Sequence, residues 1–138
     1  MPDLAELRVA ARAARENAYA RYSHFTVGAA VETTDGRRFT GANIENASYG
    51  LAICAERTAV FAAVLAGARE IAAVAVTGPD GVTTPPCGAC RQVLAEFGTP
   101  DVPLTYARAD GSWSDTTLGA LLPVAFDAAS LDAVRGNG

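Results

Sequence analysis

The chain contains no lysine, one histidine and only three cysteines in 138 residues. Its basic residues are all arginines and are scattered, and the net charge is −4. Without a basic cluster to neutralise phosphates, a nucleic-acid partner is not expected. An odd cysteine count argues against a disulfide framework. The N-terminus has no apolar signal core and no stretch approaches membrane-spanning length, so we expect a reducing cytoplasm and no membrane partner.

Half of the residues are hydrophobic, which is enough for a packed core in one domain spanning residues 1–138. Helical spacing and capping residues predict helices over 3–20, 52–66, 87–97, 118–122 and 130–135. Apolar, β-branched runs bounded by turn residues predict strands over 27–33, 37–42, 71–77, 102–107 and 112–117.

All three cysteines lie in two short segments, Cys54-Ala55-Glu56 and Pro86-Cys87-Gly88-Ala89-Cys90. Cys87 and Cys90 are three residues apart at a predicted helix start, so both sulfurs can face one ion. Three thiolates bind tetrahedral zinc and leave the fourth position to water, as in catalytic zinc sites. Glu56 is near enough to take and return a proton of that water. The pattern indicates one catalytic zinc ion per chain.

Simpler interpretations exist for several of these residues. The Cys-x-x-Cys pair alone could be redox-active or simply buried, but this leaves Cys54 and Glu56 unexplained. His24 stands apart from both metal segments, which favours a surface or structural role. Arg57 and Gln92 follow the two segments closely, and each is either a solvated helix residue or a hydrogen-bond donor to the thiolates.

Two phenylalanines remain ambiguous from the sequence itself. Phe25 and Phe126 each adjoin polar or turn residues rather than a periodic apolar run. Both are compatible with an ordinary core and with the aromatic wall of a base-binding pocket.

Four segments, residues 25–30, 43–49, 54–59 and 86–93, together resemble cytidine deaminase, specifically its short, homotetrameric type. The likeness extends over nearly the whole chain. It implies a three-layer α/β/α sandwich with a five-stranded mixed sheet and with zinc held between two helix N-termini. It also implies zinc-dependent hydrolysis of cytidine and 2′-deoxycytidine to uridine and 2′-deoxyuridine plus ammonia, as in pyrimidine salvage.

By the same resemblance, Glu56 takes a proton from the zinc-activated water, delivers it to N3 of cytosine, and returns a proton to the departing amine. Asn43 and Glu45 would bind the ribose 3′-hydroxyl group. Phe25 would pack against the nucleoside, and the Ala55 backbone N–H would meet the cytosine carbonyl.

The resemblance further implies a homotetramer with shared active sites. Phe126 would reach the base from a neighbouring subunit, and Ala47 and Tyr49 would also contribute across the interface. The substrate would be a small-molecule nucleoside.

Three alternatives compete with this function. Blasticidin-S deaminase shares the zinc segments, but the loop from Asn43 to Asn46 and Phe126 favour the nucleoside enzyme. A nucleic-acid-editing deaminase would have histidine as first ligand and a basic groove. This chain has Cys54 at the first ligand position and no basic cluster, so this alternative is disfavoured. A catalytically inactive zinc-binding interaction module is disfavoured by Glu56 and by the lack of a fourth cysteine.

Overall fold

Five strands form one mixed sheet in the computed structural model, which describes residues 2–135; residues 1 and 136–138 of the expected domain lie outside this range. The strands are β1 (Gly28–Thr33), β2 (Arg38–Ala42), β3 (Ile71–Thr77), β4 (Pro103–Ala107) and β5 (Trp113–Thr117). The helices are α1 (Leu4–Arg15), α2 (Ala55–Leu65), α3 (Gly88–Phe97), α4 (Leu118–Leu121) and α5 (Ala128–Arg135), with a 3₁₀ turn η1 (Tyr49–Leu51). No helix of the described range is both long and apolar enough to span a bilayer.

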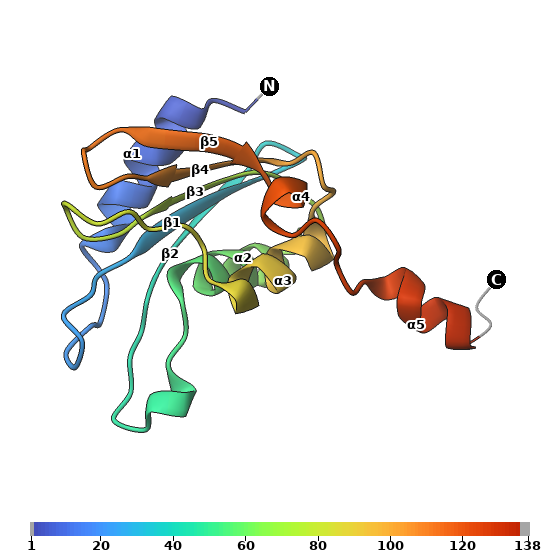
Figure 1. The fold of residues 1–138 in the computed structure, drawn as a ribbon, viewed down its shortest axis with the longest axis horizontal. Helices are drawn as coiled ribbons and strands as arrows, with labels where there is room; N and C mark the ends of the chain where they lie inside the picture. The colour runs from blue at the N-terminus through green and yellow to red at the C-terminus, as the bar shows by residue number, and fades with distance from the viewer. Residues whose placement is uncertain (1, 136–138) are drawn as a thin grey trace.

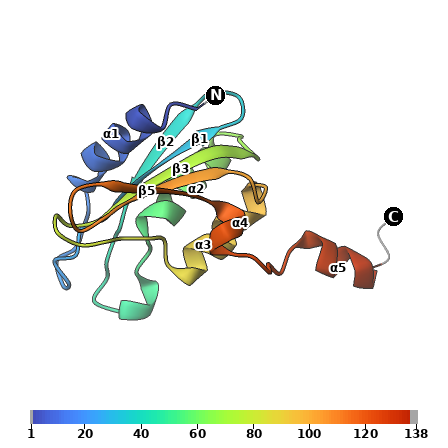
Figure 2. The same ribbon diagram turned by 45° about the horizontal axis from the view of Figure 1, so that its top comes forward.

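The sheet has the strand order β2-β1-β3-β4-β5. β1 pairs antiparallel with both β2 and β3, β3 pairs parallel with β4, and β5 closes the sheet antiparallel to β4. α1 covers one face, whereas α2 and α3 cover the other, as Figures 1 and 2 show. The structure thus confirms the expected three-layer α/β/α fold with a five-stranded mixed sheet.

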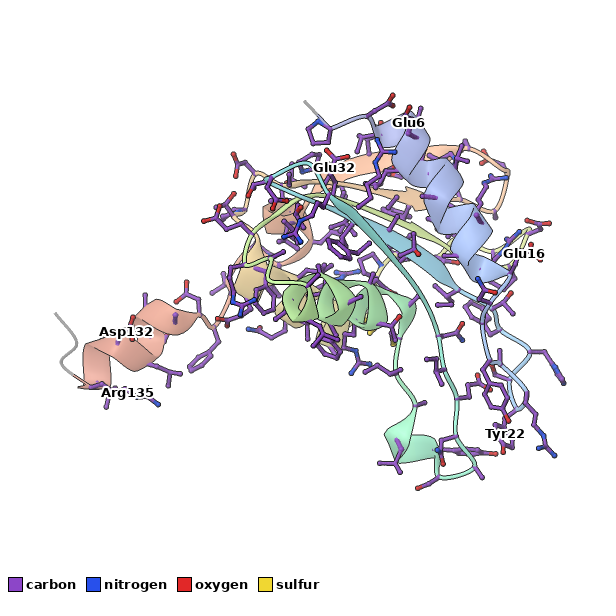
Figure 3. All side chains as sticks on the ribbon, turned by 180° about the vertical axis from the view of Figure 1, so that it is seen from behind. Glu6, Glu16, Tyr22, Glu32, Asp132 and Arg135 are labelled. Atoms are coloured by element: carbon purple, nitrogen blue, oxygen red, sulfur yellow. The ribbon has the colours of Figure 1, made fainter. Side chains whose placement is uncertain are left out.

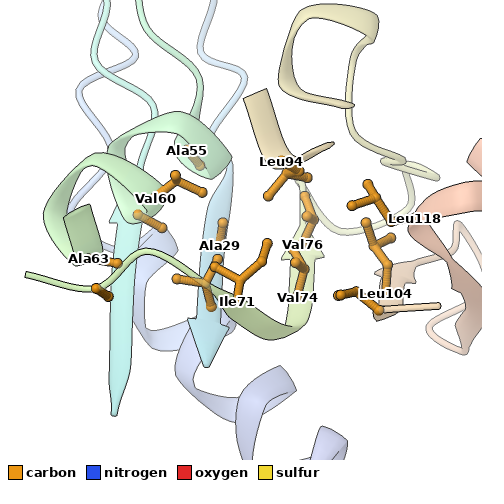
Figure 4. Packing of buried hydrophobic residues seen from close by; sticks show 14 residues of the cluster. Ala29, Ala55, Val60, Ala63, Ile71, Val74, Val76, Leu94, Leu104 and Leu118 are labelled. Atoms are coloured by element: carbon orange, nitrogen blue, oxygen red, sulfur yellow. The ribbon is translucent and has the colours of Figure 1, made fainter. Parts of the chain in front are cut away.

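The main core lies between the sheet and the layer of α2 and α3 (Figure 4). Val60, Val74 and Leu94 are fully buried there, and Leu104 and Leu118 extend the cluster toward β4 and α4. A smaller cluster joins α1 to alanines on the opposite face of the sheet. Burying one side chain of this size stabilises the folded state by about 1.5–3 kcal/mol. The core therefore holds α2 and α3, the two helices that begin at the cysteines, firmly against the sheet.

Two glycines allow helices to approach the sheet closely. A Cβ on Gly28 would lie 2.0 Å from the carbonyl oxygen of Ala11 in α1. A Cβ on Gly41 would lie 2.5 Å from the carbonyl oxygen of Ala55, in the first turn of α2. Both distances are below any real contact, so side chains here would displace the helices. Gly41 therefore sets the position of the helix start that carries Cys54.

α1 ends at Arg15, five residues before the predicted end. The reason is tertiary: the Tyr19 N–H donates to the Asn43 carbonyl at 2.9 Å, and the Glu45 N–H donates to the Tyr19 carbonyl at 2.8 Å. These bonds draw the chain after α1 alongside the loop that follows β2. At the C-terminal end of the chain, α5 projects away from the three layers (Figures 1 and 3), and none of its residues is buried.

Candidate active site

The three cysteine sulfurs meet at the starts of two helices. Cys54 is the N-cap of α2, Cys87 is the N-cap of α3, and Cys90 lies in the first turn of α3. The Cys54 and Cys87 sulfurs are 3.8 Å apart, those of Cys87 and Cys90 are 3.3 Å apart, and all three lie within 4.8 Å of one another. Sulfurs bound at about 2.3 Å around a tetrahedral zinc ion lie about 3.8 Å apart. The sulfur spacing therefore fits one zinc ion.

Arg57 supplies positive charge beside the sulfurs. Its Nη2 donates to Cys54 Sγ at 3.1 Å, as expected for a donor to the thiolates. The neighbouring Cys90 thiol and this guanidinium lower the pKa of Cys54 to about 5, and the Cys54 thiolate in turn raises the pKa of Cys90. The same contact raises the pKa of Arg57, which keeps its charge. Arg57 therefore places a permanent positive charge against the Cys54 sulfur, which favours its thiolate form.

Glu56 is the buried carboxyl of this site. It lies in the first turn of α2, only 4% exposed. Burial is the largest cause of its raised pKa, and the nearby Cys54 charge adds to it. A carboxyl group whose pKa is shifted toward neutrality both accepts and donates protons readily near pH 7. A buried carboxyl group that could carry a proton therefore lies close to Cys54 and Cys90.

A pocket of about 400 Å³ opens above these groups. This volume lies in the range of small-molecule sites. Its lining comes from three chain segments, namely Ser23, Phe25 and Val27; then Asn43, Glu45 and residues 52–57; then Thr84, Pro85 and Cys87. The pocket thus brings together all four of the substrate contacts expected within one chain: Phe25, Asn43, Glu45 and Ala55.

The Asn43 side chain hydrogen-bonds to the backbone of Phe25 and Val27. Its Nδ2 donates to the Phe25 carbonyl at 2.7 Å, and its Oδ1 accepts from the Val27 N–H at 2.9 Å. Both ends of the amide are therefore engaged, and one N–H of Nδ2 is left over for a ligand. Asn43 therefore fixes the position of the extended segment from Phe25 to Val27.

Glu45 is held by the turn at Tyr22 and Ser23. Its Oε1 accepts from the Tyr22 N–H at 2.9 Å and from the Ser23 N–H at 3.0 Å, and its Oε2 accepts from the Ser23 hydroxyl. The Ser23 hydroxyl is the largest cause of the lowered pKa of Glu45. Glu45 therefore offers an ionised carboxylate at the pocket wall.

The expected contacts from a neighbouring subunit do not line this pocket. Ala47 and Tyr49 lie on the outer loop, where the Tyr49 ring packs edge-on against Tyr22 with centroids 6.3 Å apart. Phe126 is 60% exposed on the segment before α5. Within the described range, none of the three lines the pocket that contains Glu56, but Tyr49 lines a neighbouring hollow that shares Ser23, Glu45 and Ala52 with it.

Gln92 differs from expectation. Rather than donating to a thiolate, its Nε2 donates to the carbonyl oxygen of Phe126 at 2.7 Å. The residue before it, Arg91, donates to the carbonyls of Pro86 and Leu121 at 2.8 and 3.1 Å. The helix turn after Cys90 therefore holds the C-terminal segment rather than the metal. Sequence spacing alone could not reveal this, because Leu121 and Phe126 lie 30 and 34 residues from their partners.

Sequence reasoning missed several lining residues: Ser23, Val27, Ala52, Ile53, Thr84 and Pro85. Ala52, Ile53, Thr84 and Pro85 directly precede the cysteine segments, and Ser23 is two residues from Phe25, so adjacency was the available signal. Their side chains carry no distinctive metal or acid–base chemistry.

Comparison with known proteins places this geometry in context. Residues 2–106 match the family model described as the cytidine and deoxycytidylate deaminase zinc-binding region. A cytidine deaminase of Halalkalibacterium halodurans is 49% identical over 119 residues, covering 86% of this chain and 90% of that protein. The crystal structure of cytidine deaminase from Burkholderia pseudomallei, 52% identical, covers 91% of this chain and 100% of its own with a TM-score of 0.83. For the Mycobacterium tuberculosis enzyme the identity is 42%, the coverage 91% and 98%, and the TM-score 0.80.

Proposed function

This chain belongs to the zinc-binding family of cytidine and deoxycytidylate deaminases, and we propose that it hydrolyses cytidine and 2′-deoxycytidine to the corresponding uridines with release of ammonia. The observation that carries the proposal is the pocket itself. Glu56, Glu45 and two of the three sulfurs that are spaced for zinc line this one pocket. A polar ring that reacts with an activated water and a sugar hydroxyl that hydrogen-bonds to a carboxylate are ligand groups that match these side chains.

Cys54, Cys87 and Cys90 would hold one zinc ion, and the chemistry that zinc would supply is to lower the pKa of a water in the site toward ~7. Glu56 takes a proton from that water and passes it to N3 of the cytosine ring. The water oxygen adds to C4 as a hydroxyl group. Glu56, which has given its first proton to N3, then takes the proton of this C4 hydroxyl group and passes it to the exocyclic nitrogen. The C4–N bond breaks, the C4 carbonyl forms, and the nitrogen leaves as ammonia. One buried carboxyl thus acts as base and as acid, and its raised pKa suits both roles.

The remaining pocket residues orient the nucleoside. Ala55 is the first residue of α2, so its N–H has no partner within the helix and can donate to the cytosine carbonyl. Phe25 presents an aromatic surface, with its backbone fixed by Asn43. Glu45 accepts a hydrogen bond from the sugar 3′-hydroxyl, and the free N–H of Asn43 is available to the same oxygen.

Assembly completes the site in this proposal. Phe126 is exposed and outside its own pocket, as a residue that serves a neighbouring pocket should be. Ala47 and Tyr49 are also exposed, so a second chain could contact them. We place four copies in a homotetramer with shared sites, acting in cytoplasmic pyrimidine salvage on a small nucleoside.

Direct assay tests the function. Zinc-loaded protein incubated with cytidine should remove the cytidine absorbance and release one ammonia per nucleoside consumed. Protein that carries zinc but leaves cytidine unchanged would instead be a zinc-binding interaction module. Blasticidin S in place of cytidine separates the two deaminase activities, and deamination of blasticidin S alone would contradict the proposal.

A further inference from the structure

The turn over residues 20–25 is shaped to hold a carboxylate. His24 has a φ of +59°, the left-handed conformation that residues other than glycine rarely adopt, and its N–H donates to the Ala20 carbonyl at 2.8 Å. Within the resulting turn, the consecutive N–H groups of Tyr22 and Ser23 both point at Glu45 Oε1. Successive backbone N–H groups that converge in this way form an anion-binding nest. Here the anion is a side chain of the same protein.

Ser23 adds a second connection through its hydroxyl group. Its Oγ donates to Glu45 Oε2 and accepts from the Phe25 N–H at 3.0 Å. One hydroxyl group therefore links the Glu45 carboxylate to the backbone of Phe25, and both residues line the pocket. Figure 3 shows Tyr22 at the tip of this turn, on the side of the η1 loop.

The hydrogen bonds leave one acceptor position of the Glu45 carboxylate unused. A carboxylate offers about four acceptor positions, two on each oxygen. Two donors occupy Oε1, and the Ser23 hydroxyl occupies one position of Oε2. A single position, on Oε2, is left for one further donor. A sugar hydroxyl group is such a donor, and it would find the acceptor already oriented.

We propose that Ser23 is a positioning residue that orients Glu45 and thereby sets the preference for nucleosides with a 3′-hydroxyl group over those without one. The inference rests on the proposed deaminase function and on the sugar contact assigned there to Glu45. Ser23 touches neither the reacting atoms nor the metal ligands. Its effect belongs to substrate binding, so it should change KM more than kcat.

A role in loop stability alone predicts a different result. If Ser23 merely held the turn together, its loss would displace Phe25 as well, and kcat/KM would also fall clearly for 3′-deoxycytidine, which makes no contact with Glu45. If it orients Glu45, the loss is confined to substrates that use Glu45. The two roles are therefore separated by comparing cytidine with 3′-deoxycytidine, which differ only in the 3′-hydroxyl group.

The experiment measures kcat and KM for both nucleosides with the zinc-loaded wild-type protein and with Ser23→Ala, Glu45→Gln and the double variant. Ser114→Ala, on β5 and outside the pocket lining, is the matched control. For Ser23→Ala we expect kcat/KM for cytidine to fall about tenfold through KM, the usual scale for a lost hydrogen bond to a charged group. The value for 3′-deoxycytidine should stay within about twofold. In the Glu45→Gln background, Ser23→Ala should add little, because the group through which it acts is already altered.

An unchanged preference in Ser23→Ala, or an equal loss for both nucleosides, would overturn the proposal. Full additivity of the two substitutions would do the same. A wild-type protein that deaminates cytidine but does not prefer it to 3′-deoxycytidine refutes this inference and leaves the deaminase function standing. A wild-type protein inactive on both nucleosides refutes the function, and the inference with it.

Discussion

Replacing Glu56 by glutamine tests the chemistry of the site while leaving its shape intact. The side chain is 4% exposed in the first turn of α2, beside the pocket floor. Glutamine has almost the same volume, so no cavity opens and the core below is not disturbed. The amide, however, cannot carry a proton at neutral pH. The substitution therefore removes one function and little else.

The magnitude follows from the number of steps that need the carboxyl. General acid–base catalysis by one positioned group contributes roughly 10²–10⁴ in rate. In the proposed mechanism Glu56 transfers one proton to the ring and another to the leaving amine, so the loss in kcat should reach or exceed 10⁴, which corresponds to about 5.5 kcal/mol. The three sulfur ligands are untouched, so the zinc content should remain near one per chain.

The assay follows cytidine absorbance at saturating substrate, with zinc measured by elemental analysis on the same samples. Glu16→Gln, at the exposed end of α1, makes the same chemical change away from the site and should leave kcat unchanged. A Glu56→Gln protein that keeps a tenth of the wild-type kcat would refute the assignment of Glu56 as the proton carrier. Loss of zinc together with activity would show that Glu56 serves the metal site rather than the proton transfers.

Three further substitutions test other parts of the site. Arg57→Ala removes the cation that contacts Cys54 Sγ, so zinc affinity should fall about 10- to 100-fold, measured by competition with a chromogenic chelator; unchanged affinity would make Arg57 an ordinary helix residue. Gln92→Ala frees the segment that carries Phe126, so KM for cytidine should rise several-fold at unchanged zinc content, and hydrogen exchange near Phe126 should accelerate; no change in either would show that the bond is incidental. Refolding Phe126→Ala chains together with Glu56→Gln chains should give more activity at subsaturating cytidine than the average of the two parents. In a mixed assembly, a pocket with an intact Glu56 can receive an intact Phe126 from a neighbouring chain. An activity equal to the average would mean that each pocket is built from one chain.

Much of the fold was predictable because its signals are local. The strand at Ile71–Thr77 has the expected bounds, since a β-branched apolar run flanked by a Gly-Pro-Asp-Gly turn is unambiguous. The helix that follows Cys87 begins at Gly88, next to its predicted start at 87. The helix that follows Cys54 begins at Ala55, three residues after its predicted start at 52, because Ile53 pairs with Ile44 and keeps the chain extended up to Cys54. The main error lies at the end of α1, where the sequence remains compatible with helix after Arg15 but the chain pairs with the loop after β2 instead. Local propensity cannot register a competing partner about 25 residues away.

The residues expected to bind the metal or transfer protons were easier to predict than the residues that hold them in place. Cys54, Glu56 and Arg57 are recognised by residue type and spacing, because their proposed roles depend on their own functional groups. Gln92 and Ser23 act through backbone partners that are remote or ambiguous in the sequence. A glutamine after a zinc ligand suggests a donor to sulfur, but only the packing of α3 against the C-terminal segment shows where the amide points.

The meeting of Cys54 and Cys87 is a consequence of strand order rather than of either motif. β2 and β3 both pair antiparallel with β1, so they run in the same direction. Ala42 and Thr77, their last residues, both lie opposite Gly28, so the two strands end at the same level of the sheet. Each is followed by a loop and a helix, so the N-termini of α2 and α3 are delivered to one edge, where ligands bind in open α/β sheets. A shift of either strand by two residues would preserve its inward-facing side chains yet move one helix start by about 7 Å. Such a shift would separate sulfurs that now lie 3.8 Å apart, so strand register, which neither cysteine segment encodes, decides whether the metal site exists.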